Sequence, residues 1–425
     1  MFLFAGTFLG LLLVSVPIAL ALGMAAAIYL AITGNFSLLL IFPQRMINSI
    51  DQFVLLSVPL FLVVGNLMNL GGITDRVLRF SNACVGHVRG GLSHVTIVAS
   101  MFFGGVTGAA AADTSALGSV LIPAMAKQGY QKDYAAALLT VCAVVGAVIP
   151  PSITMVVYGA LAQVSVAQLF IAGIVPGILI GLALMPYAWF VAWRNGYPIS
   201  VRVNMRERLG ATVHAAPVLV LPALILGGIM LGIFTPTESA AIAVIYIMLL
   251  AFAYGVLSWR NIWRPMAEAA TLTAAIMFIV AMASMIQFIF SYERIPHQIT
   301  QLMLGITDNK YLLLLMINVL LLVLGMFLET IAAMILALPV LLEIAKVIQI
   351  DPVHFGIIVV INLSIGLATP PVGVCLFIAC GIAKVPIEKV SITMLPMIAI
   401  AIGVLMLVTF VPAVSLFLPS LFFDR

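Results

Sequence analysis

Long apolar runs follow one another along almost the whole chain, separated by short polar stretches. They lie at about 3–32, 53–70, 132–163, 166–193, 213–233, 236–258, 266–290, 352–382 and 392–418. A bilayer core of about 30 Å is crossed by about 20 apolar residues in a helix. Transmembrane β-barrels instead show alternating segments of about ten residues, and the sequence has none of these. The pattern therefore predicts an all-α polytopic membrane protein.

Two further apolar stretches, at about 91–127 and 311–346, are interrupted near their middles by small or polar residues. The first interruption is the run Gly-Gly-Val-Thr-Gly at 104–108, and the second is Gly-Met-Phe-Leu-Glu-Thr at 325–330. Each half of these stretches holds about 15 residues, which is too short to cross a bilayer. We therefore expect two re-entrant helical hairpins that enter and leave on the same side of the membrane.

The distribution of basic residues tests this topology. With the N-terminus in the cytoplasm and each hairpin counted as no crossing, 13 of the 18 lysines and arginines fall on the cytoplasmic side. A full crossing at 91–127 would place Arg89 and Lys127 on opposite sides. The positive-inside rule is therefore satisfied only when both hairpins are re-entrant.

The two halves of the chain have the same order of predicted elements but start from opposite faces of the membrane. Each half reads as two spans, a hairpin, a broken span and a final span. Inverted repeats with paired broken helices are typical of secondary transporters. We expect a first repeat at 1–193, a cytoplasmic linker at 194–212, a connecting transmembrane helix at 213–235 and a second repeat at 236–425.

Pairs of prolines interrupt the spans at 132–163 and 352–382. Proline removes a backbone donor and breaks a helix, so Pro150-Pro151 and Pro370-Pro371 uncover carbonyl oxygens on the preceding turn. Broken backbone at membrane depth is tolerated only against protein or a wet cavity. One such pair alone would indicate a structural kink. Two pairs at equivalent places in the repeat favour an oxygen-lined cation site, to which the Ser152 and Thr369 hydroxyls would add.

The hairpin tips are the natural partners of these breaks. Gly104, Gly105 and Gly108 permit close backbone approach and unusual dihedral angles, and Thr107 offers a hydroxyl group. Helix N-termini directed at a cavity favour an anion. Tight packing by small residues, which is common in membrane interfaces, explains the tip composition equally well.

Two carboxylates lie inside the apolar hairpins. Acids at membrane depth are rare, and they line a pathway or find a partner. We therefore expect Asp113 and Glu329 either to contribute to cation binding, directly or from a supporting position, or to be protonated and hydrogen-bonded. Asp113, Thr114 and Ser115 together are candidates for a substrate site or for support around the cation.

Two other motifs have structural explanations. Thr235-Pro236-Thr237-Glu238 fits a capping box with proline at the first helical position. The spacing of Gly173, Gly177 and Gly181 fits close helix packing.

Composition agrees with the pattern and excludes several classes of protein. Apolar residues make up 64% of the 425 residues and charged residues 8%, with a mean hydropathy of +1.29, whereas soluble domains carry about 25% charged residues. The sequence contains no Gly-Lys pair, hence no P-loop, and no His-Glu-x-x-His motif. The four cysteines have no Cys-x-x-Cys spacing. Nucleotide hydrolysis, zinc chemistry and a disulfide framework are therefore not indicated.

Several segments resemble the large membrane subunit, the M or DctM type, of tripartite ATP-independent periplasmic (TRAP) transporters. The resemblance runs over essentially the whole chain. It is carried by the segments 60–73, 85–91 (Val-Gly-His-Val-Arg-Gly-Gly), 149–152 (Ile-Pro-Pro-Ser), 232–238 (Gly-Ile-Phe-Thr-Pro-Thr-Glu) and 351–356 (Asp-Pro-Val-His-Phe-Gly).

The resemblance implies an elevator-type importer in a bacterial inner membrane, driven by co-transported sodium and carrying an organic acid, either a C4-dicarboxylate or sialic acid. It also implies two partners, a separate small four-helix membrane subunit (Q-type) and a periplasmic substrate-binding protein (P-type). No organic cofactor is implied.

Family sodium sites lie between each hairpin tip and the facing Pro-Pro break. The first set is Gly105, Thr107, Gly108, Gly146, Pro150, Pro151 and Ser152, and the second set is Gly325, Glu329, Thr330, Gly366, Thr369, Pro370, Pro371 and Gly373. Many family members have a more serine-rich first tip than this chain.

Three alternatives stay open at this point. A sodium–anion symporter could work without a binding protein, and an anion channel would conduct without coupling. A membrane enzyme is the weakest alternative, because the sequence shows no nucleophile–base pair and no metal-binding constellation.

Overall fold

The computed structural model describes residues 2–199 and 204–423, and every regular element in this part of the chain is a helix. The first half contains α1 (Phe2–Leu13), α2 (Ile18–Ile32), α3 (Phe36–Leu39), α4 (Phe42–Ile50), the 3-10 helix η1 (Phe53–Leu56), α5 (Ser57–Met68), α6 (Gly71–Val85), α7 (Gly91–Thr107), α8 (Ala110–Lys127), α9 (Lys132–Val148), α10 (Ile153–Ala162) and α11 (Val166–Arg194). The second half contains α12 (Met205–Met230), α13 (Pro236–Ala253), α14 (Trp263–Tyr292), α15 (Ile295–Ile306), α16 (Lys310–Phe327), α17 (Thr330–Val347), α18 (Pro352–Ala368), α19 (Val374–Ala383), α20 (Ile387–Phe410) and α21 (Ala413–Phe423).

The described helices confirm a polytopic membrane protein. Seven of them are long and apolar enough to cross a membrane, or up to nine if each of two bent helix pairs counts as one span. One of these pairs, α9 and α10, is bent by 44° at the Pro150-Pro151 break. The expected broken span at 132–163 is therefore present.

The prediction of a single N-terminal span at 3–32 is wrong. The chain forms two shorter helices, α1 and α2, which pack against each other. Pro17 lacks an N–H and disfavours helical geometry at Val16, and Ser15 has a φ of 63°. The apolar pattern is uninterrupted here, so the turn is set by backbone chemistry at the proline and not by polarity.

The two expected hairpins are present, but their arms are longer than the sequence suggested. α7 has 17 residues, and α8, α16 and α17 have 18 each. α16 and α17 are among the helices that are long enough to cross a membrane. The prediction that each arm of the second hairpin is too short to cross a bilayer is therefore wrong. Both hairpins turn within two residues, at Gly108-Ala109 and at Leu328-Glu329.

Several elements have no counterpart in the predicted spans. The helices α6 and α15, each with one polar and one apolar face, directly precede the hairpins α7–α8 and α16–α17. α12 begins at Met205, inside the segment expected to be a linker, and the apolar run at 392–418 is divided between α20 and α21.

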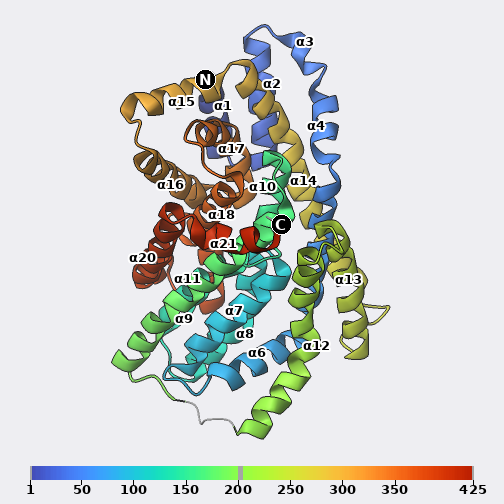
Figure 1. Ribbon diagram of the computed structural model, residues 1–425, viewed down its shortest axis with the longest axis vertical. Coiled ribbons are helices and arrows are strands. Elements are labelled where there is room, and N and C mark those ends of the chain that lie inside the picture. Colours follow the sequence, from blue (N-terminus) through green and yellow to red (C-terminus); the bar gives the residue numbers. More distant parts are fainter. Residues whose placement is uncertain (1, 200–203, 424–425) are drawn as a thin grey trace.

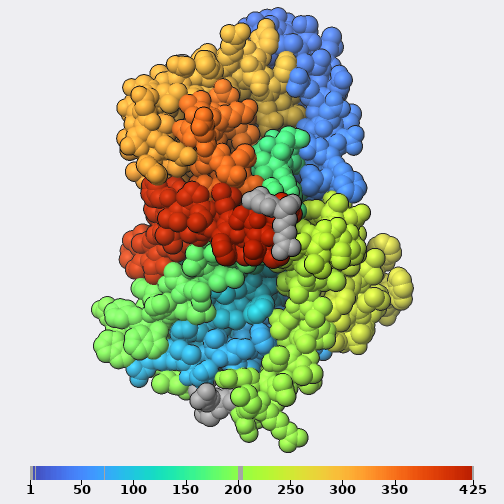
Figure 2. All heavy atoms as spheres, viewed as in Figure 1, coloured from blue at the N-terminus to red at the C-terminus, as the bar shows by residue number. Residues whose placement is uncertain are grey.

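The hairpins lie in opposite ends of the molecule. Figure 1 shows α7 and α8 in the lower part with α9 beside them, and α16 and α17 in the upper part, with α11 and α18 between the two levels. The amphipathic helices follow the same division, with α6 low and α15 high in the view. Figure 2 shows α4 beside the later α14 along one edge, and these helices are in contact.

The core of the molecule is built around the first arms of the two broken helices. Every residue of α9 after Lys132 and every residue of α18 after Pro352 is buried. A helix that is apolar on all sides is stable only when neighbours surround it. The Pro-Pro breaks at the ends of α9 and α18 are thereby held inside the protein.

Candidate functional site

The first break lies between α9 and α10, where residues 149–152 leave the helix. Pro150 and Pro151 have no N–H, so the carbonyls of Gly146 and Ala147 lose their helical donors. The Ser152 hydroxyl donates to the Ala147 carbonyl at 2.6 Å and accepts from the Met155 N–H at 3.4 Å. Ser152 thus both caps α10 and replaces one of the missing donors.

The tip of the first hairpin lies directly against this break. A Cβ added to Gly104 would stand 2.1 Å from the Cα of Gly146, and a Cβ on Gly108 would stand 2.6 Å from the Pro151 carbonyl oxygen. Gly108 has a φ of 63°, and its carbonyl accepts a hydrogen bond from the Ile153 N–H at 3.3 Å. Only glycine meets these two demands, close approach and a positive φ. The tip glycines therefore make the contact between hairpin and break.

Asp113 is the charged group at this contact. It lies in the first turn of α8, is 1% exposed, and accepts a 2.5 Å hydrogen bond from the Thr107 hydroxyl through Oδ1. Its Oδ2 is buried and has no hydrogen-bond partner within the described residues, and a Cβ on Gly146 would stand 2.5 Å from it. A buried carboxylate oxygen without a donor is expensive to maintain. This oxygen is free to hold a cation.

The other two candidate residues of α8, Thr114 and Ser115, point in different directions. Thr114 is fully buried, and its hydroxyl donates to the Ala110 carbonyl at 2.8 Å. Ser115 is exposed, one helical position further round, so the structure does not bring it together with Asp113.

The second hairpin meets the second break in the same manner. A Cβ on Gly325 of α16 would stand 3.0 Å from the Cα of Gly366 of α18, and a Cβ on Gly366 would stand 2.5 Å from the Cα of Gly325. Pro370 and Pro371 remove the donors that the Gly366 and Leu367 carbonyls would have in a continuous helix, and the Gly366 carbonyl accepts instead from the Thr369 N–H at 2.9 Å. In both halves, therefore, the main chains of the hairpin and of the broken helix meet at a pair of glycines.

Polar groups around the second break are arranged differently from those around the first. The Thr369 hydroxyl donates to the Ile365 carbonyl at 2.7 Å. Gly373 has a φ of 52°, and its added Cβ would stand 3.0 Å from the Thr369 carbonyl oxygen. Both Pro-Pro peptide bonds are cis.

Glu329 is the N-cap of α17. Its Oε2 accepts hydrogen bonds from the N–H groups of Ile331 at 3.0 Å and Ala332 at 3.3 Å. The neighbouring Thr330 hydroxyl is buried and has no partner in the described part of the chain. One oxygen of Glu329 therefore has a capping role, and the Thr330 hydroxyl supplies a further uncommitted oxygen.

The two breaks lie next to each other at the centre of the protein. A small cluster of buried residues joins α8 and α9 of the first half to the second break, with members Ala110, Ala143, Ala147, Leu367 and Cys375. Pro150 and Pro151 are buried, whereas Pro371 and Val372 are exposed. The first break is consequently closed and the second is open to one side.

The two structural interpretations made from the sequence are confirmed. Thr235 and Glu238 form a reciprocal capping box at the start of α13. Added Cβ atoms on Gly173, Gly177 and Gly181 would meet Met155, Ile149 and Met101 at 2.4 Å or less. The glycine face of α11 therefore packs behind the first break and supports it.

A polar cavity of about 840 Å³ lies among α4, α10 and α14, and the sequence did not point to it. Its lining includes Gln44, Asn48, Gln163 and Gln287 and, within the described residues, one charged side chain, Arg45. The guanidinium group of Arg45 lies 4.1 Å above the Phe288 ring, where a cation–π contact holds it in the cavity wall. The only local sequence feature that could have indicated this cavity is the polar face of residues 42–50.

The donor groups at the two breaks suit a hard monovalent cation. Main-chain carbonyls, hydroxyls and a carboxylate supply oxygen atoms only, the type of ligand that alkali and alkaline-earth ions prefer. Among the residues described, no group of three or more His, Cys, Asp or Glu side chains could hold a metal ion. The donor atoms present are compatible with a hard cation, and Asp113 Oδ2 is the carboxylate oxygen at the first break that has no hydrogen-bond partner among the described residues.

Comparison with known proteins identifies relatives over the whole chain. The family model described as "Tripartite ATP-independent periplasmic transporter, DctM component" matches residues 5–414. An isethionate TRAP transporter permease protein DctMQ of Oleidesulfovibrio alaskensis is 41% identical over 97% of this chain, which covers 65% of that longer protein.

Two relatives have nearly the same length as this chain. The sialic acid TRAP transporter large permease protein SiaM of Vibrio cholerae is 36% identical over 97% of each protein. The C4-dicarboxylate TRAP transporter large permease protein DctM of Pseudomonas aeruginosa is 38% identical over 92% of this chain and 93% of its own length.

A solved structure shows that the fold is known. The crystal structure of the YdaH transporter of Alcanivorax borkumensis matches with a TM-score of 0.66, covering 89% of this chain and 88% of that protein, at 15% sequence identity. At this identity the likeness concerns the fold alone.

Proposed function

The chain belongs to the DctM family of tripartite ATP-independent periplasmic transporters, and we propose that it imports an organic acid anion together with sodium. The observation that carries the proposal is the contact of each hairpin tip with a Pro-Pro break, at Gly104–Gly146 and at Gly325–Gly366. Two such contacts, made of main chain and oxygen atoms at the centre of a membrane protein, suit coupled binding of cations and an anion.

Sodium would bind at each contact. At the first break its ligands would be drawn from Asp113 Oδ2, the uncovered carbonyls near Gly146 and the Ser152 hydroxyl. At the second, Thr330, Thr369, the Leu367 carbonyl and the Glu329 carboxylate, whose Oε2 caps α17, supply oxygens. The oxygens of Asp113 and Thr330 that have no hydrogen-bond partner among the described residues support these cation sites. A bound cation would satisfy these groups, which are otherwise expensive to bury.

The anion would lie between the hairpin tips, beside the small-residue cluster where the two breaks meet. Bound sodium would offset the anion's charge there, and the N-terminus of α8 would add its positive end. The relatives are named for isethionate, sialic acid and C4-dicarboxylates. We therefore propose an organic acid substrate of the C4-dicarboxylate or sialic acid class.

The movement we propose is an elevator. The hairpins and broken helices would move as one body against the remaining helices, and the two halves would be inverted repeats, with the N-terminus in the cytoplasm of a bacterial inner membrane. The opposite positions of the two hairpins in Figure 1 support this arrangement. The cavity lined by Arg45 lies between α4 and α14 on one side and the end of α10 on the other, where a moving body would meet a fixed one.

Two partners complete the proposed system, a small four-helix membrane subunit and a periplasmic binding protein that delivers the substrate. Reconstituting the three proteins in liposomes tests the proposal directly. We expect uptake of labelled sialic acid, malate or isethionate that requires an inward sodium gradient and the binding protein. Uptake that ignores sodium contradicts the coupling, and sodium-driven uptake without the binding protein supports the stand-alone symporter instead.

The same liposomes test the site. Replacing Pro150 and Pro151, or Pro370 and Pro371, by alanine restores backbone donors to the uncovered carbonyls, so we expect sodium-dependent uptake to be abolished while the protein stays inserted. Pro396→Ala is the matched control, because Pro396 lies inside α20 on an exposed face. Wild-type uptake by both double variants would rule out the breaks as the cation sites.

A further inference from the structure

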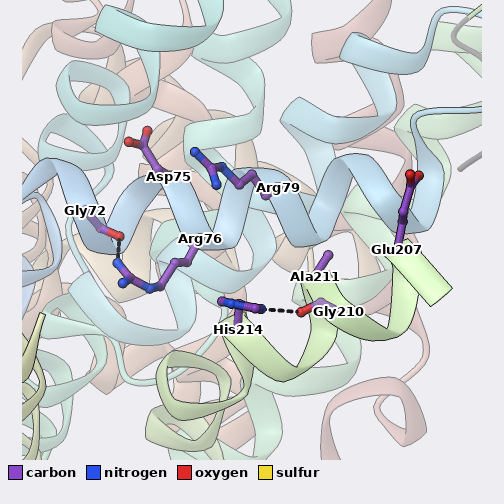
Figure 3. A pocket seen from close by; sticks show the side chains of 8 residues that line it. All are labelled: Gly72, Asp75, Arg76, Arg79, Glu207, Gly210, Ala211 and His214. Atoms are coloured by element: carbon purple, nitrogen blue, oxygen red, sulfur yellow. Dashed lines mark hydrogen bonds between the residues drawn. The ribbon is translucent and has the colours of Figure 1, made fainter.

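A charged cavity of about 480 Å³ lies between α6 and α12, away from the hairpin tips and the breaks. Figure 3 shows the two helices side by side, with Arg76 and His214 on the sides of α6 and α12 that face each other, Asp75 and Arg79 on the other side of α6, and Glu207 at the opposite end of the view from Asp75. On α6 the lining residues Gly72, Asp75, Arg76 and Arg79 recur every three or four positions, and so do Glu207, Gly210, Ala211 and His214 on α12. Each helix therefore presents one continuous face to the cavity.

The cavity carries two guanidinium groups and two carboxylates. Arg76 stacks on the Tyr254 ring at 3.5 Å and donates to the Gly72 carbonyl, which fixes its position and leaves other N–H groups available. The ion pairs found within the described residues are Arg264–Glu268 and Lys389–Asp133. Asp75, Arg79 and Glu207 therefore line the cavity without an ion-pair partner in that part of the chain.

An apolar groove of about 320 Å³ continues from the same edge of α6. It shares Asp75 and Arg79 with the charged cavity and extends over the hairpin arms α7 and α8, where it is lined by Leu92, Val95, Val120, Leu121 and Ala124. A charged cavity that opens into an apolar groove matches a molecule with a charged head and a hydrocarbon tail.

We propose that this site binds a phospholipid with a zwitterionic ammonium headgroup, of the phosphatidylethanolamine type. The guanidinium groups of Arg76 and Arg79 bind the phosphate, and the carboxylate of Asp75, which lines both the cavity and the groove, binds the ammonium group. One acyl chain occupies the apolar groove between α6 and the first hairpin.

The balance of charges selects this headgroup over its alternatives. An anionic phospholipid would place its extra negative charge or its neutral hydroxyls beside the Asp75 carboxylate, and free phosphate would leave both this carboxylate and the groove unused. A quaternary ammonium headgroup has no N–H to donate to Asp75. An amphipathic helix such as α6 also belongs at the level of lipid headgroups.

The test uses the purified full-length chain, delipidated in detergent, with phosphatidylethanolamine, phosphatidylglycerol or phosphatidylcholine of identical acyl chains added back. Native mass spectrometry counts the bound lipid, and thermal unfolding gives the change in Tm. We expect phosphatidylethanolamine to bind about fivefold more tightly than either other lipid, the ratio given by one or two exposed ion pairs. It should also raise Tm, whereas inorganic phosphate alone should not.

Two variants and a control locate the site. Arg79→Gln should lower phosphatidylethanolamine occupancy about fivefold, and Asp75→Asn should remove most of the preference over phosphatidylglycerol. Arg260→Gln changes an exposed arginine that does not line the cavity and should behave as wild type. Equal or tighter binding of phosphatidylglycerol, or unchanged occupancy in both variants, would overturn the proposal. Comparing the Tm of each lipid-free variant with wild type separates lost binding from lost folding.

Discussion

Asp113 combines burial, charge and an incomplete set of hydrogen bonds in one side chain. The Thr107 hydroxyl satisfies Oδ1, while Oδ2 has no donor in the described part of the chain. Aspartate is expensive to retain at such a position unless the free oxygen has a ligand. Gly104, Gly108 and Gly146 leave the space that this arrangement needs.

Replacing Asp113 by asparagine tests the role of the charge at nearly constant size. We expect the sodium concentration for half-maximal uptake to rise by about tenfold or more, because interactions with a charged oxygen contribute about 1.5–3 kcal/mol. Uptake by reconstituted protein at graded sodium concentrations measures this. The control is Ser115→Ala on the exposed face of α8. An unchanged sodium dependence in Asp113→Asn would remove Asp113 from the site.

Gly146 provides a second test at the residue scale. In Gly146→Ala the new methyl group would collide with Asp113 Oδ2 at 2.5 Å and approach Gly104 Cα at 3.3 Å. We expect loss of uptake and a decrease in the free energy of unfolding of roughly 1–3 kcal/mol, as for an overpacked core. Gly403→Ala is the matched control, since its Cβ would meet nothing within 4 Å, and should be neutral in thermal unfolding. Equal behaviour of the two variants would show that the contact is not tight.

At the scale of elements, a buried polar network ties the second hairpin to the helices behind it. Asn362 of α18 donates to the Asn318 Oδ1 of α16 at 2.7 Å, and Asn318 donates to the Thr409 hydroxyl of α20 at 3.0 Å. Asn318 and Asn362 are fully buried and Thr409 is 1% exposed. Since hydrogen bonds are directional, the network fixes the register of α16 on α18 and so the position of Gly325 on Gly366.

Removing both asparagines of this network should cost less than the sum of the two single removals. Asn362→Leu leaves the Asn318 Oδ1 buried without its donor, and we expect a loss of about 1–3 kcal/mol in the free energy of unfolding. The double variant Asn318→Leu/Asn362→Leu removes both partners and should lose less than the sum of the single variants. Thermal or denaturant unfolding in detergent measures the cycle, and strict additivity would show that the two asparagines are not coupled.

Elements marked by a proline pair or a capping box could be predicted from the sequence, whereas boundaries inside continuous apolar runs could not. The prolines at 150–151 and 370–371 end α9 and α18 as expected, and Thr235 starts α13 with its capping box. The turn between α1 and α2 and the full length of the hairpin arms were not predicted. Both lie in uniformly apolar sequence, where the pattern contains no polar position to mark a boundary.

At the scale of the whole molecule, the two hairpins have their open ends at opposite extremes of the fold (Figure 1). Arg89 and Lys127 flank the first hairpin, and Lys310 and Lys346 lie at the open end of the second. By length and composition alone, α16 and α17 could each cross a bilayer. A re-entrant hairpin has both of its ends on the same side of the membrane, whereas a single crossing arm would put them on opposite sides. The side from which each hairpin end is accessible therefore distinguishes the two arrangements.

Cysteine labelling in oriented vesicles measures this sidedness. With the native cysteines replaced, we expect Arg89→Cys and Lys127→Cys to react with an impermeant maleimide from the cytoplasmic side only. Lys310→Cys and Lys346→Cys should react only from the other side, since the positive-inside arrangement requires it. Reaction of positions 89 and 127 from opposite sides would exclude a re-entrant first hairpin and the elevator derived from it.

The sequence by itself determined the class of protein, the two hairpins, the proline breaks and the capping and glycine-packing motifs. These properties depend on composition and on what a residue can do within its own helical turn. Only the tertiary structure decided that Gly104 rests on Gly146 and Gly325 on Gly366, that one oxygen of Asp113 is without a donor, and that Ser115 faces outward. It also brought α6 and α12, more than a hundred residues apart, together around one charged cavity. Such facts depend on the rotation of each helix about its axis and on contacts between distant segments, which a local pattern of residues does not fix.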